Sequence, residues 1–321
     1  ISRLPIKSSS FAVTLGGIGI ETVKKKIQNA ARLNTFIEPL KEAEATGYIL
    51  SCGYWDDTVK VHSMDGAKVL CSEAGGHRGA IRCLSMCSDS PFLITGGQDA
   101  TCRVWVVDHI DMAVALGDGY TQTTQVGSNA GTGLLKLCHV LWGHRHPIAC
   151  LDMSAELDIA VSGDLGGLIC VHTIRRGEFI RSMMPIPNEA SYSVQEIALS
   201  HTGTFVAYLD NQSLHSITVN NAHLCSTNVD DEINAMKLTS DGEILVTGGK
   251  KGHVVIRSAH DLLVLSSLDL SKHGPIRCIS FTSDILNPIP QFLFVGSEDG
   301  LVTLLTENKD SSVEEEVVVF V

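Results

Sequence analysis

The sequence lacks the marks of several large protein classes. No stretch approaches the roughly 18 uninterrupted apolar residues of a membrane-spanning helix, and residues 1–10 hold no apolar run long enough for a secretory signal. An excess of positive charge is also missing, since 24 basic residues stand against 36 acidic ones and the formal net charge is −12. Such a surface repels phosphate backbones and anionic lipids. We therefore expect no nucleic-acid ligand, and membrane association only of an indirect kind.

Signatures of catalysis and of metal binding are missing too. The sequence has no G-x-S-x-G motif and no Walker loop, and none of its ten cysteines forms a C-x2-C pair. The triplet from His144 to His146 has no cysteine or acidic residue spaced to complete a zinc site. We predict no catalytic residue, no metal and no cofactor. Many of the cysteines fall in apolar runs, which favours a reduced, cytoplasmic setting.

The chain does have an internal repeat of about 43 residues, the length of one propeller blade. Each copy has a short apolar run, a glycine, a polar turn and a second, alternating run, most clearly from Phe92 to Trp105. The anchoring glycines are Gly53, Gly96, Gly163, Gly248 and Gly296. Their steps are 43, 67, 85 and 48 residues. The step of 67 contains an insert at 108–136, and the step of 85 contains two repeats. The repeat predicts four-stranded blades stacked around an axis.

We expect an all-β propeller of seven four-stranded blades with one short N-terminal helix. Six repeats are visible, at 42–71, 76–108, 143–181, 193–224, 231–268 and 273–307. The seventh blade would be assembled from residues 11–40 with help from the tail. Apolar spacing in residues 19–33 predicts the helix.

The expected organisation is a divergent first blade with the helix over 1–40, repeat blades over 41–310, and a tail over 311–321. The tail is either a closing strand, for which Phe11–Leu15 is a candidate partner, or a frayed end. The insert at 108–136 is rich in Gly and Thr. It is either a tolerated disordered insertion or a partner-specific arm.

Three features resemble the WD-repeat family: Gly76-His77, Gly143-His144 and Trp105. The resemblance implies a side-chain network that joins His77, Thr95, Asp99 and Trp105. An imidazole, a hydroxyl, a carboxylate and an indole N–H can satisfy one another and tie strand edges together. The next blade keeps His144 and Ser162, with Gly166 at the carboxylate position and His172 at the indole position. These histidines are therefore expected to be structural.

A narrower resemblance is to the propeller of neurobeachin-type BEACH proteins, over residues 34–306. It is carried by residues 48–56, 157–163, 230–235 and 240–255. In that family the propeller closes a very large protein, after pleckstrin-like and BEACH domains, and the proteins are scaffolds in vesicle trafficking. The resemblance implies that this chain binds other proteins or peptides, including other domains of a longer chain. It also implies a cytoplasmic location, peripheral to intracellular membranes through those other domains.

Two functions remain as hypotheses. The first is a non-catalytic protein-interaction scaffold, whose partners would contact loops at the rims. Tyr54, Tyr120 and Arg145 are candidate contacts, because aromatic residues and arginines are common binding anchors. The alternative is a hydrolase with its site in the central channel, which would need polar residues converging there from several blades.

Overall fold

The computed structural model describes eleven stretches of the chain. They are residues 13–17, 47–54, 56–63, 69–74, 76–86, 90–107, 134–186, 192–239, 241–281, 292–307 and 313–318. These residues form 24 β-strands in six antiparallel sheets of four strands, with one short 3-10 turn and no α-helix. In the same stretches, no helix has the length and apolar character to cross a membrane.

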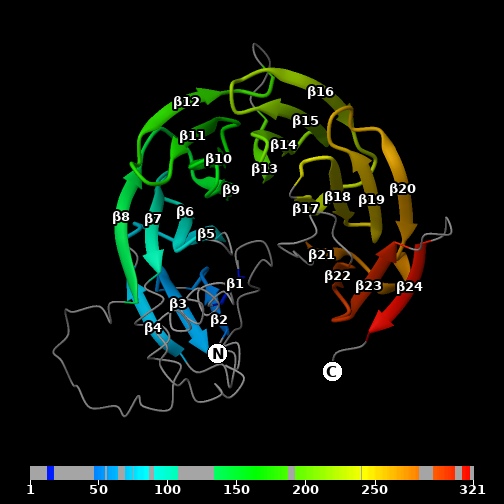
Figure 1. Cartoon of the computed structure of the whole chain (residues 1–321), viewed down its shortest axis with the longest axis horizontal. Helices are drawn as coiled ribbons and strands as arrows, with labels where there is room; N and C mark the ends of the chain where they lie inside the picture. Colours follow the sequence, from blue (N-terminus) through cyan, green and yellow to red (C-terminus); the bar gives the residue numbers. More distant parts are fainter. Residues whose placement is uncertain are drawn as a thin grey trace, which may run out of the picture. The chain divides into compact units, whose positions relative to one another are not determined.

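Each sheet is a meander of four consecutive strands, and we number the sheets as blades 1 to 6 (Figure 1). Blade 1 holds β1 (Val13–Gly17), β2 (Gly47–Ser51), β3 (Thr58–Ser63) and β4 (Val69–Ala74). Blade 2 holds β5 (Ile81–Met86), β6 (Phe92–Gly97), β7 (Cys102–Val107) and β8 (Leu135–Leu141). Blade 3 holds β9 (Ile148–Ser154), β10 (Ile159–Asp164), β11 (Ile169–Thr173) and β12 (Phe179–Met183).

The other three blades follow the same order. Blade 4 holds β13 (Val194–Leu199), β14 (Thr204–Leu209), β15 (Ser213–Thr218) and β16 (His223–Asn228). Blade 5 holds β17 (Ile233–Leu238), β18 (Ile244–Gly249), β19 (His253–Ser258) and β20 (Val264–Asp269). Blade 6 holds β21 (Ile276–Phe281), β22 (Phe292–Ser297), β23 (Val302–Glu307) and β24 (Val313–Val318).

Tight turns with glycine join many of these strands. Gly203 precedes β14 with φ of 83°, and Gly242 precedes β18 with φ of 77°. Few residues other than glycine adopt this left-handed region without strain. The Thr-Gly and Asp-Gly pairs of the sequence thus set the hairpins between the first and second strands of blades 4 and 5.

The chain divides into two compact units. The first covers Ile1–Trp142 with Ile174–Glu178, and the second covers Gly143–Thr173 with Phe179–Val321. In the first unit, the facing sides of blades 1 and 2 share one apolar core, which includes Leu50, Val61, Leu93 and Trp105. Strands β1 and β5, the innermost of the two sheets, contact each other.

In the second unit, blades 3 to 6 stack through three further cores. Blades 3 and 4 share Val171 and Phe205, blades 4 and 5 share Leu214 and Leu245, and blades 5 and 6 share Val254 among others. The innermost strands β9, β13, β17 and β21 contact one another in turn, while β12, β16 and β20 lie on the outside (Figure 1). Within each unit, neighbouring sheets therefore bury apolar faces against each other, as propeller blades do.

The all-β propeller was expected correctly, but the count of seven blades was wrong, because the described residues make six sheets. Both chain ends complete existing blades instead of building a new one. Strand β1 pairs with β2 and supplies the innermost strand of blade 1, and β24 pairs with β23 and supplies the outermost strand of blade 6. The first and last repeats of the sequence supply three strands each. Strand β1 therefore completes the sheet of blade 1, and β24 completes the sheet of blade 6.

Other expectations lie outside the described residues or differ from the observed pairing. The helix predicted over residues 19–33 lies outside the described residues, and so does the insert up to residue 133. The pairing of the tail with residues 11–15 is replaced by the pairings of β1 and β24 with their own sheets. The domain boundaries at residues 40 and 310 stay a prediction.

Candidate functional site

The four side chains expected to form a network in blade 2 lie together. The His77 ring reaches Asp99 through Nδ1, 2.9 Å from Oδ1, and Thr95 through Nε2, 2.9 Å from Oγ1. The Trp105 indole Nε1 donates to the same Thr95 oxygen over 3.0 Å. Thr95 and the His77 side chain are fully buried, and Trp105 is 4% exposed. The network joins the loop before β5 to β6 and β7.

The protonation states of His77 and Asp99 set the direction of each hydrogen bond in the network. Burial lowers the pKa of His77, although Asp99 acts to raise it, so the ring is neutral. Burial acts to raise the pKa of Asp99, but hydrogen bonds from the Arg78 amide, His77 and Thr101 outweigh it and lower the pKa to about 2. His77 Nδ1 therefore donates to the Asp99 carboxylate, and Nε2 accepts from the Thr95 hydroxyl. Both ring nitrogens are occupied inside the blade.

Blade 3 contains a second network, and its carboxylate was missed. His144 Nδ1 lies 3.0 Å from Asp164 Oδ2, and His144 Nε2 lies 2.8 Å from Ser162 Oγ. Gly166, at the turn position of Asp99, contributes only its amide, which donates to Asp164 over 2.9 Å. The imidazole of His172, at the indole position, packs edge-on against Phe179. Asp164 ends β10, two residues after Ser162, where blade 2 has Gly97.

The local geometry explains this exchange. A Cβ at Gly97 would collide with the His77 ring and with the Asp99 carboxylate. Blade 2 therefore needs glycine at the end of β6 so that the carboxylate can approach from the turn. Blade 3 has Asp164 at that strand position and its carboxylate reaches the histidine directly. A search for Asp only in the turn overlooks it.

Blade 1 uses a tyrosine in a related arrangement. The Tyr54 hydroxyl lies 2.7 Å from Ser51 Oγ and 3.3 Å from His62 Nε2, and Ser51 Oγ lies 3.0 Å from the same nitrogen. Tyr54 is half-buried, and its ring lies 4.0 Å from Lys60 Nζ. Tyr54 was predicted as a partner contact, but its hydroxyl is engaged within blade 1. Of the other predicted contacts, Arg145 is exposed, and Tyr120 lies outside the described residues.

Blade 6 retains half of the network. His273 Nδ1 lies 3.1 Å from Asp299 Oδ2, and Asp299 also accepts from the Ser297 hydroxyl and the Leu301 amide. Val295 and Leu305 occupy the positions that Thr95 and Trp105 have in blade 2. The histidine and aspartate remain, while the buried hydroxyl and indole do not.

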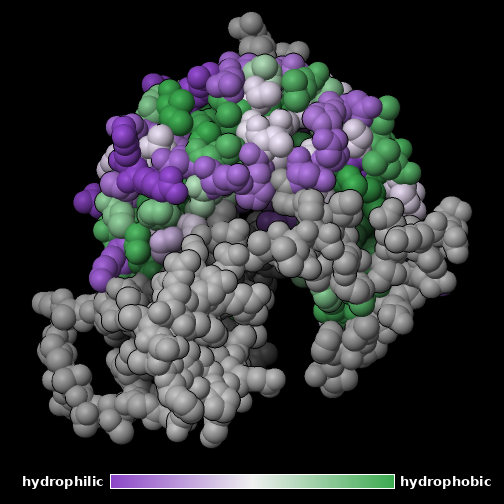
Figure 2. Space-filling model, viewed as in Figure 1, coloured by the Kyte–Doolittle hydropathy of each residue, from purple (hydrophilic) through white to green (hydrophobic). Residues whose placement is uncertain are grey.

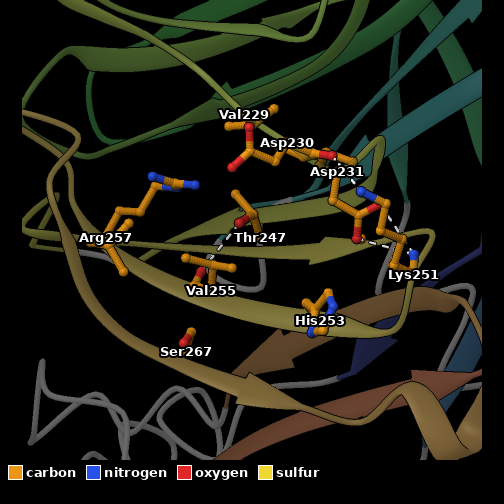
Figure 3. Close-up of a pocket in the computed structure, with 12 residues that line it drawn as sticks. Val229, Asp230, Asp231, Thr247, Lys251, His253, Val255, Arg257 and Ser267 are labelled. Carbon is orange, nitrogen blue, oxygen red and sulfur yellow. Dashed lines mark hydrogen bonds between the residues drawn. The ribbon is translucent and has the colours of Figure 1, made fainter.

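Blade 5 keeps the threonine position of blade 2 but not its tryptophan, and a cavity lies beside these positions. Cross-strand pairing joins Leu93 to Trp105 in blade 2 and Leu245 to Arg257 in blade 5, so Arg257 has the place of the tryptophan. Thr247 has the place of Thr95 and donates to the Val255 carbonyl over 3.2 Å. A cavity of about 410 Å³ opens beside them (Figure 3). Its lining residues are Val229, Asp230, Asp231, Ile233, Thr247, Gly249, Lys251, His253, Val255, Arg257, Val264 and Ser267.

The cavity lies in the seam between blades 4 and 5. Leu245 packs in the core that these two blades share, and its cross-strand partner Arg257 projects from the same side of the sheet. Figure 3 shows Arg257 at one end of the cavity and the pair Asp231 and Lys251 at the other. At the latter end, Asp231 accepts from the Lys251 amide over 3.0 Å, and Lys251 Nζ donates to the Asp230 carbonyl.

Arg257 is a charged group of the cavity that has an unsatisfied donor. Its Nη1 donates to the Leu262 carbonyl over 3.4 Å, and its buried Nε has no hydrogen-bond partner. Burial lowers the pKa of Arg257, and the charge of Asp230 opposes that change. Guanidinium stays charged in proteins, so the cavity holds a fixed cation beside an unused donor.

The described residues contain no group of three or more metal-ligating side chains. What the cavity offers is a shaped opening with one under-bonded guanidinium, hydroxyl groups of Thr247 and Ser267, and apolar walls. Such a surface can bind a ligand of complementary shape and charge. The sequence held a signal for it, since Arg257 stands at the same register as Trp105.

The sequence profile described as the neurobeachin beta propeller domain matches residues 7–309. BEACH domain-containing protein B of Arabidopsis thaliana is 33% identical over 226 residues, which are 68% of this chain and 8% of that protein. BEACH domain-containing protein lvsE of Dictyostelium discoideum is 24% identical over 273 residues, which are 80% of this chain and 11% of that protein. The chain thus spans only a small part of these relatives.

Solved structures agree on the fold. The structure of U3-55K has a TM-score of 0.65 at 13% identity, over 85% of this chain and 79% of that chain. The crystal structure of RRP9 WD40 repeats also has a TM-score of 0.65 at 13% identity, over 85% of this chain and 78% of that chain. At such low identity the likeness concerns the fold alone.

Proposed function

The chain belongs to the neurobeachin-type propeller family of BEACH proteins, and from this premise we propose that it is a non-catalytic docking scaffold for other proteins. WD40 propellers generally mediate protein–protein interactions, which supports the proposal. Its partners include other domains of a longer chain, and it serves vesicle trafficking in the cytoplasm at intracellular membranes. Membrane contact then comes through those other domains.

The observation that carries the proposal is the state of the buried histidines. Both ring nitrogens of His77 and of His144 lie within hydrogen-bond distance of side chains of their own blade. A general base needs a nitrogen within reach of the substrate proton. These histidines therefore support blade structure over hydrolysis, and a hydrolase would need a base elsewhere.

Affinity purification tests the proposal. The tagged propeller is incubated with cytosol beside an unrelated propeller of the same fold, which controls for nonspecific capture. We expect a reproducible set of proteins on this chain alone, and direct binding when one of them is purified and titrated by calorimetry. Identical capture by both propellers, or turnover in a panel of hydrolase substrates, would contradict it.

The role in trafficking needs its own experiment. Deletion of the propeller from a full-length relative should move that protein away from intracellular membranes or slow the passage of a vesicle cargo. The matched control is a full-length protein whose propeller is replaced by the unrelated one. If the protein kept its normal location and its cargo passed normally after the deletion, the proposed role in trafficking would be contradicted. The proposed scaffold function would still stand.

A further inference from the structure

The cavity between blades 4 and 5 has room for a ligand, and hydrogen bonds fix the backbone at both of its ends. At one end, the turn after β19 is fixed to blade 4, since the Ser216 hydroxyl donates to the Ala259 carbonyl and the Cys225 thiol donates to the His260 carbonyl. At the other end, Asp231 and Lys251 hold the chain before β17 against the turn before β19. Hydrogen bonds therefore fix the backbone segments at both ends of the cavity.

The guanidinium of Arg257 gives the seam its charge preference. Two other arginines also have a buried Nε without a partner, but each has a short bond elsewhere. Arg103 donates to the Gly76 carbonyl over 2.6 Å, and Arg181 donates to the Asn220 carbonyl over 2.8 Å. Arg257 has only its 3.4 Å bond, and it lines the cavity. Its missing partner is an acceptor, and a carboxylate fits a guanidinium with two parallel bonds.

The acidic neighbours select among anions. Asp230 and Asp231 line the same cavity, and the chain carries a net charge of −12. A doubly charged phosphate would be repelled more strongly here than a carboxylate with a single charge. The charge pattern therefore favours one carboxylate side chain at Arg257.

The rim of the cavity adds an apolar surface. Val264 is directly opposite Arg257 in the ladder and lines the cavity, yet it is 55% exposed. Its neighbours Leu263 and Leu265 are 64% and 60% exposed. Hydrophobic atoms occur over the outer strand β20 in the space-filling view (Figure 2). Contiguous exposed apolar groups of this kind often mark binding surfaces.

The edge of β20 also limits how a partner binds. The register shifts between Ile256 and Arg257, so Leu265 has no cross-strand partner. A bulge of this kind twists an edge strand away from regular pairing. We therefore expect recognition through side chains and not through the addition of a fifth strand.

We propose that this seam binds a segment of a partner protein in which a carboxylate side chain enters the cavity and pairs with Arg257, while flanking apolar side chains cover Leu263 to Leu265. The proposal rests on the scaffold function and names one of its docking sites. The occupant is a peptide of acidic and apolar character. A free phosphate is the rival ligand that the test must separate.

The test uses the whole chain and a phage-displayed library of random peptides. Peptides selected on the wild-type chain are synthesised, and their affinities are measured by fluorescence anisotropy for the wild type and four variants. Arg257→Met removes the cation, Arg257→Lys keeps it, and Arg257→Trp fills the seam with the residue of blade 2. Arg176→Met removes an exposed arginine outside the cavity and is the control for net charge.

We expect the selected peptides to share an Asp or Glu between apolar residues. Their affinity should fall at least about tenfold in Arg257→Met and in Arg257→Trp, and by less in Arg257→Lys, because a charge-assisted hydrogen bond is lost or kept. Arg176→Met should bind like the wild type. Replacement of the peptide carboxylate by its amide should reproduce the loss, and inorganic phosphate should not compete.

Several results would overturn the proposal: no selected peptide, peptides without a carboxylate, equal affinity for Arg257→Met, or displacement by inorganic phosphate. Thermal unfolding of each variant separates loss of binding from loss of fold. If Arg257→Met binds the selected peptides as the wild type does and still captures the partners found by affinity purification, the seam assignment fails while the scaffold function stands.

Discussion

Blade 2 and blade 5 have the same strand register but fill the equivalent seam in different ways. In blade 2, Trp105 occupies the seam toward blade 1, and Thr95 links it to the buried histidine. In blade 5, Thr247 remains, but Arg257 replaces the indole and a cavity of about 410 Å³ opens toward blade 4. The comparison teaches that one register position serves packing in one blade and is available for binding in another.

The largest expected effect is the loss of the indole in blade 2. Trp105→Ala should lower the free energy of unfolding by about 3–5 kcal/mol, because it leaves a cavity and removes a buried hydrogen bond. Arg257→Ala, at the same register, should cost no more than about 1 kcal/mol, because its site is already open. Chemical denaturation of both variants measures this. Equal losses would mean that the two seams do not differ in packing.

A second effect concerns the charge of the network in blade 2. The folded pKa of Asp99 is about 2, below its ordinary 3.8. Its stabilisation is therefore complete above about pH 4 and is lost as the pH falls through about 2, and it amounts to about 2 kcal/mol. The gap in unfolding free energy between wild type and Asp99→Asn should shrink over that window. If the unfolding free energies of the wild type and of Asp99→Asn changed with pH in parallel, the stabilisation by Asp99 would not depend on its negative charge.

The comparison can also be sharpened by making blade 5 like blade 2. Arg257→Trp should raise the unfolding free energy by about 1 kcal/mol, because an apolar ring fills the cavity and Thr247 can accept from its indole. A thermal unfolding curve shifted upward is the expected result. Arg257→Met is the matched control, since it removes the charge without filling the space. A lower midpoint for the tryptophan variant would mean that the seam is not a vacated packing site.

The smallest effect is expected in blade 6, where only half of the network remains. The side chains of His273 and Asp299 are 24% and 36% exposed. His273→Ala should cost no more than about 0.5 kcal/mol, as for exposed ion pairs in general. His77→Ala in blade 2 is the reference and should cost several times more in the same denaturation experiment. Equal losses of unfolding free energy in His273→Ala and His77→Ala would mean that the histidine stabilises blade 6 as much as blade 2.

The sequence predicted much of this fold because each repeat consists of apolar runs separated by turns that contain glycine. It did not predict the blade count, because residues 18–46, which carry no repeat signal, separate β1 from β2, and because the tail that forms β24 was expected to help build a seventh blade. The blade 2 network could be listed because Gly76-His77 and Trp105 stand at recognisable spacing. Asp164 was missed because its carboxylate comes from the strand and not from the turn.

The cavity could not be predicted in the same way. A sequence pattern shows that Arg257 stands where a tryptophan would, but not whether neighbouring side chains close the space. That depends on the distances set where the turn after β19 bonds to blade 4 and where the chain before β17 bonds to the turn before β19. Such distances follow from contacts between blades, which no local pattern records.

The most direct measurement is the position of a bound acidic and apolar peptide in a crystal structure of the complex. The account predicts a peptide carboxylate within hydrogen-bond distance of the Arg257 guanidinium and apolar peptide side chains over Leu263 to Leu265. A peptide bound in the central channel, or on a blade rim away from β19 and β20, would contradict it.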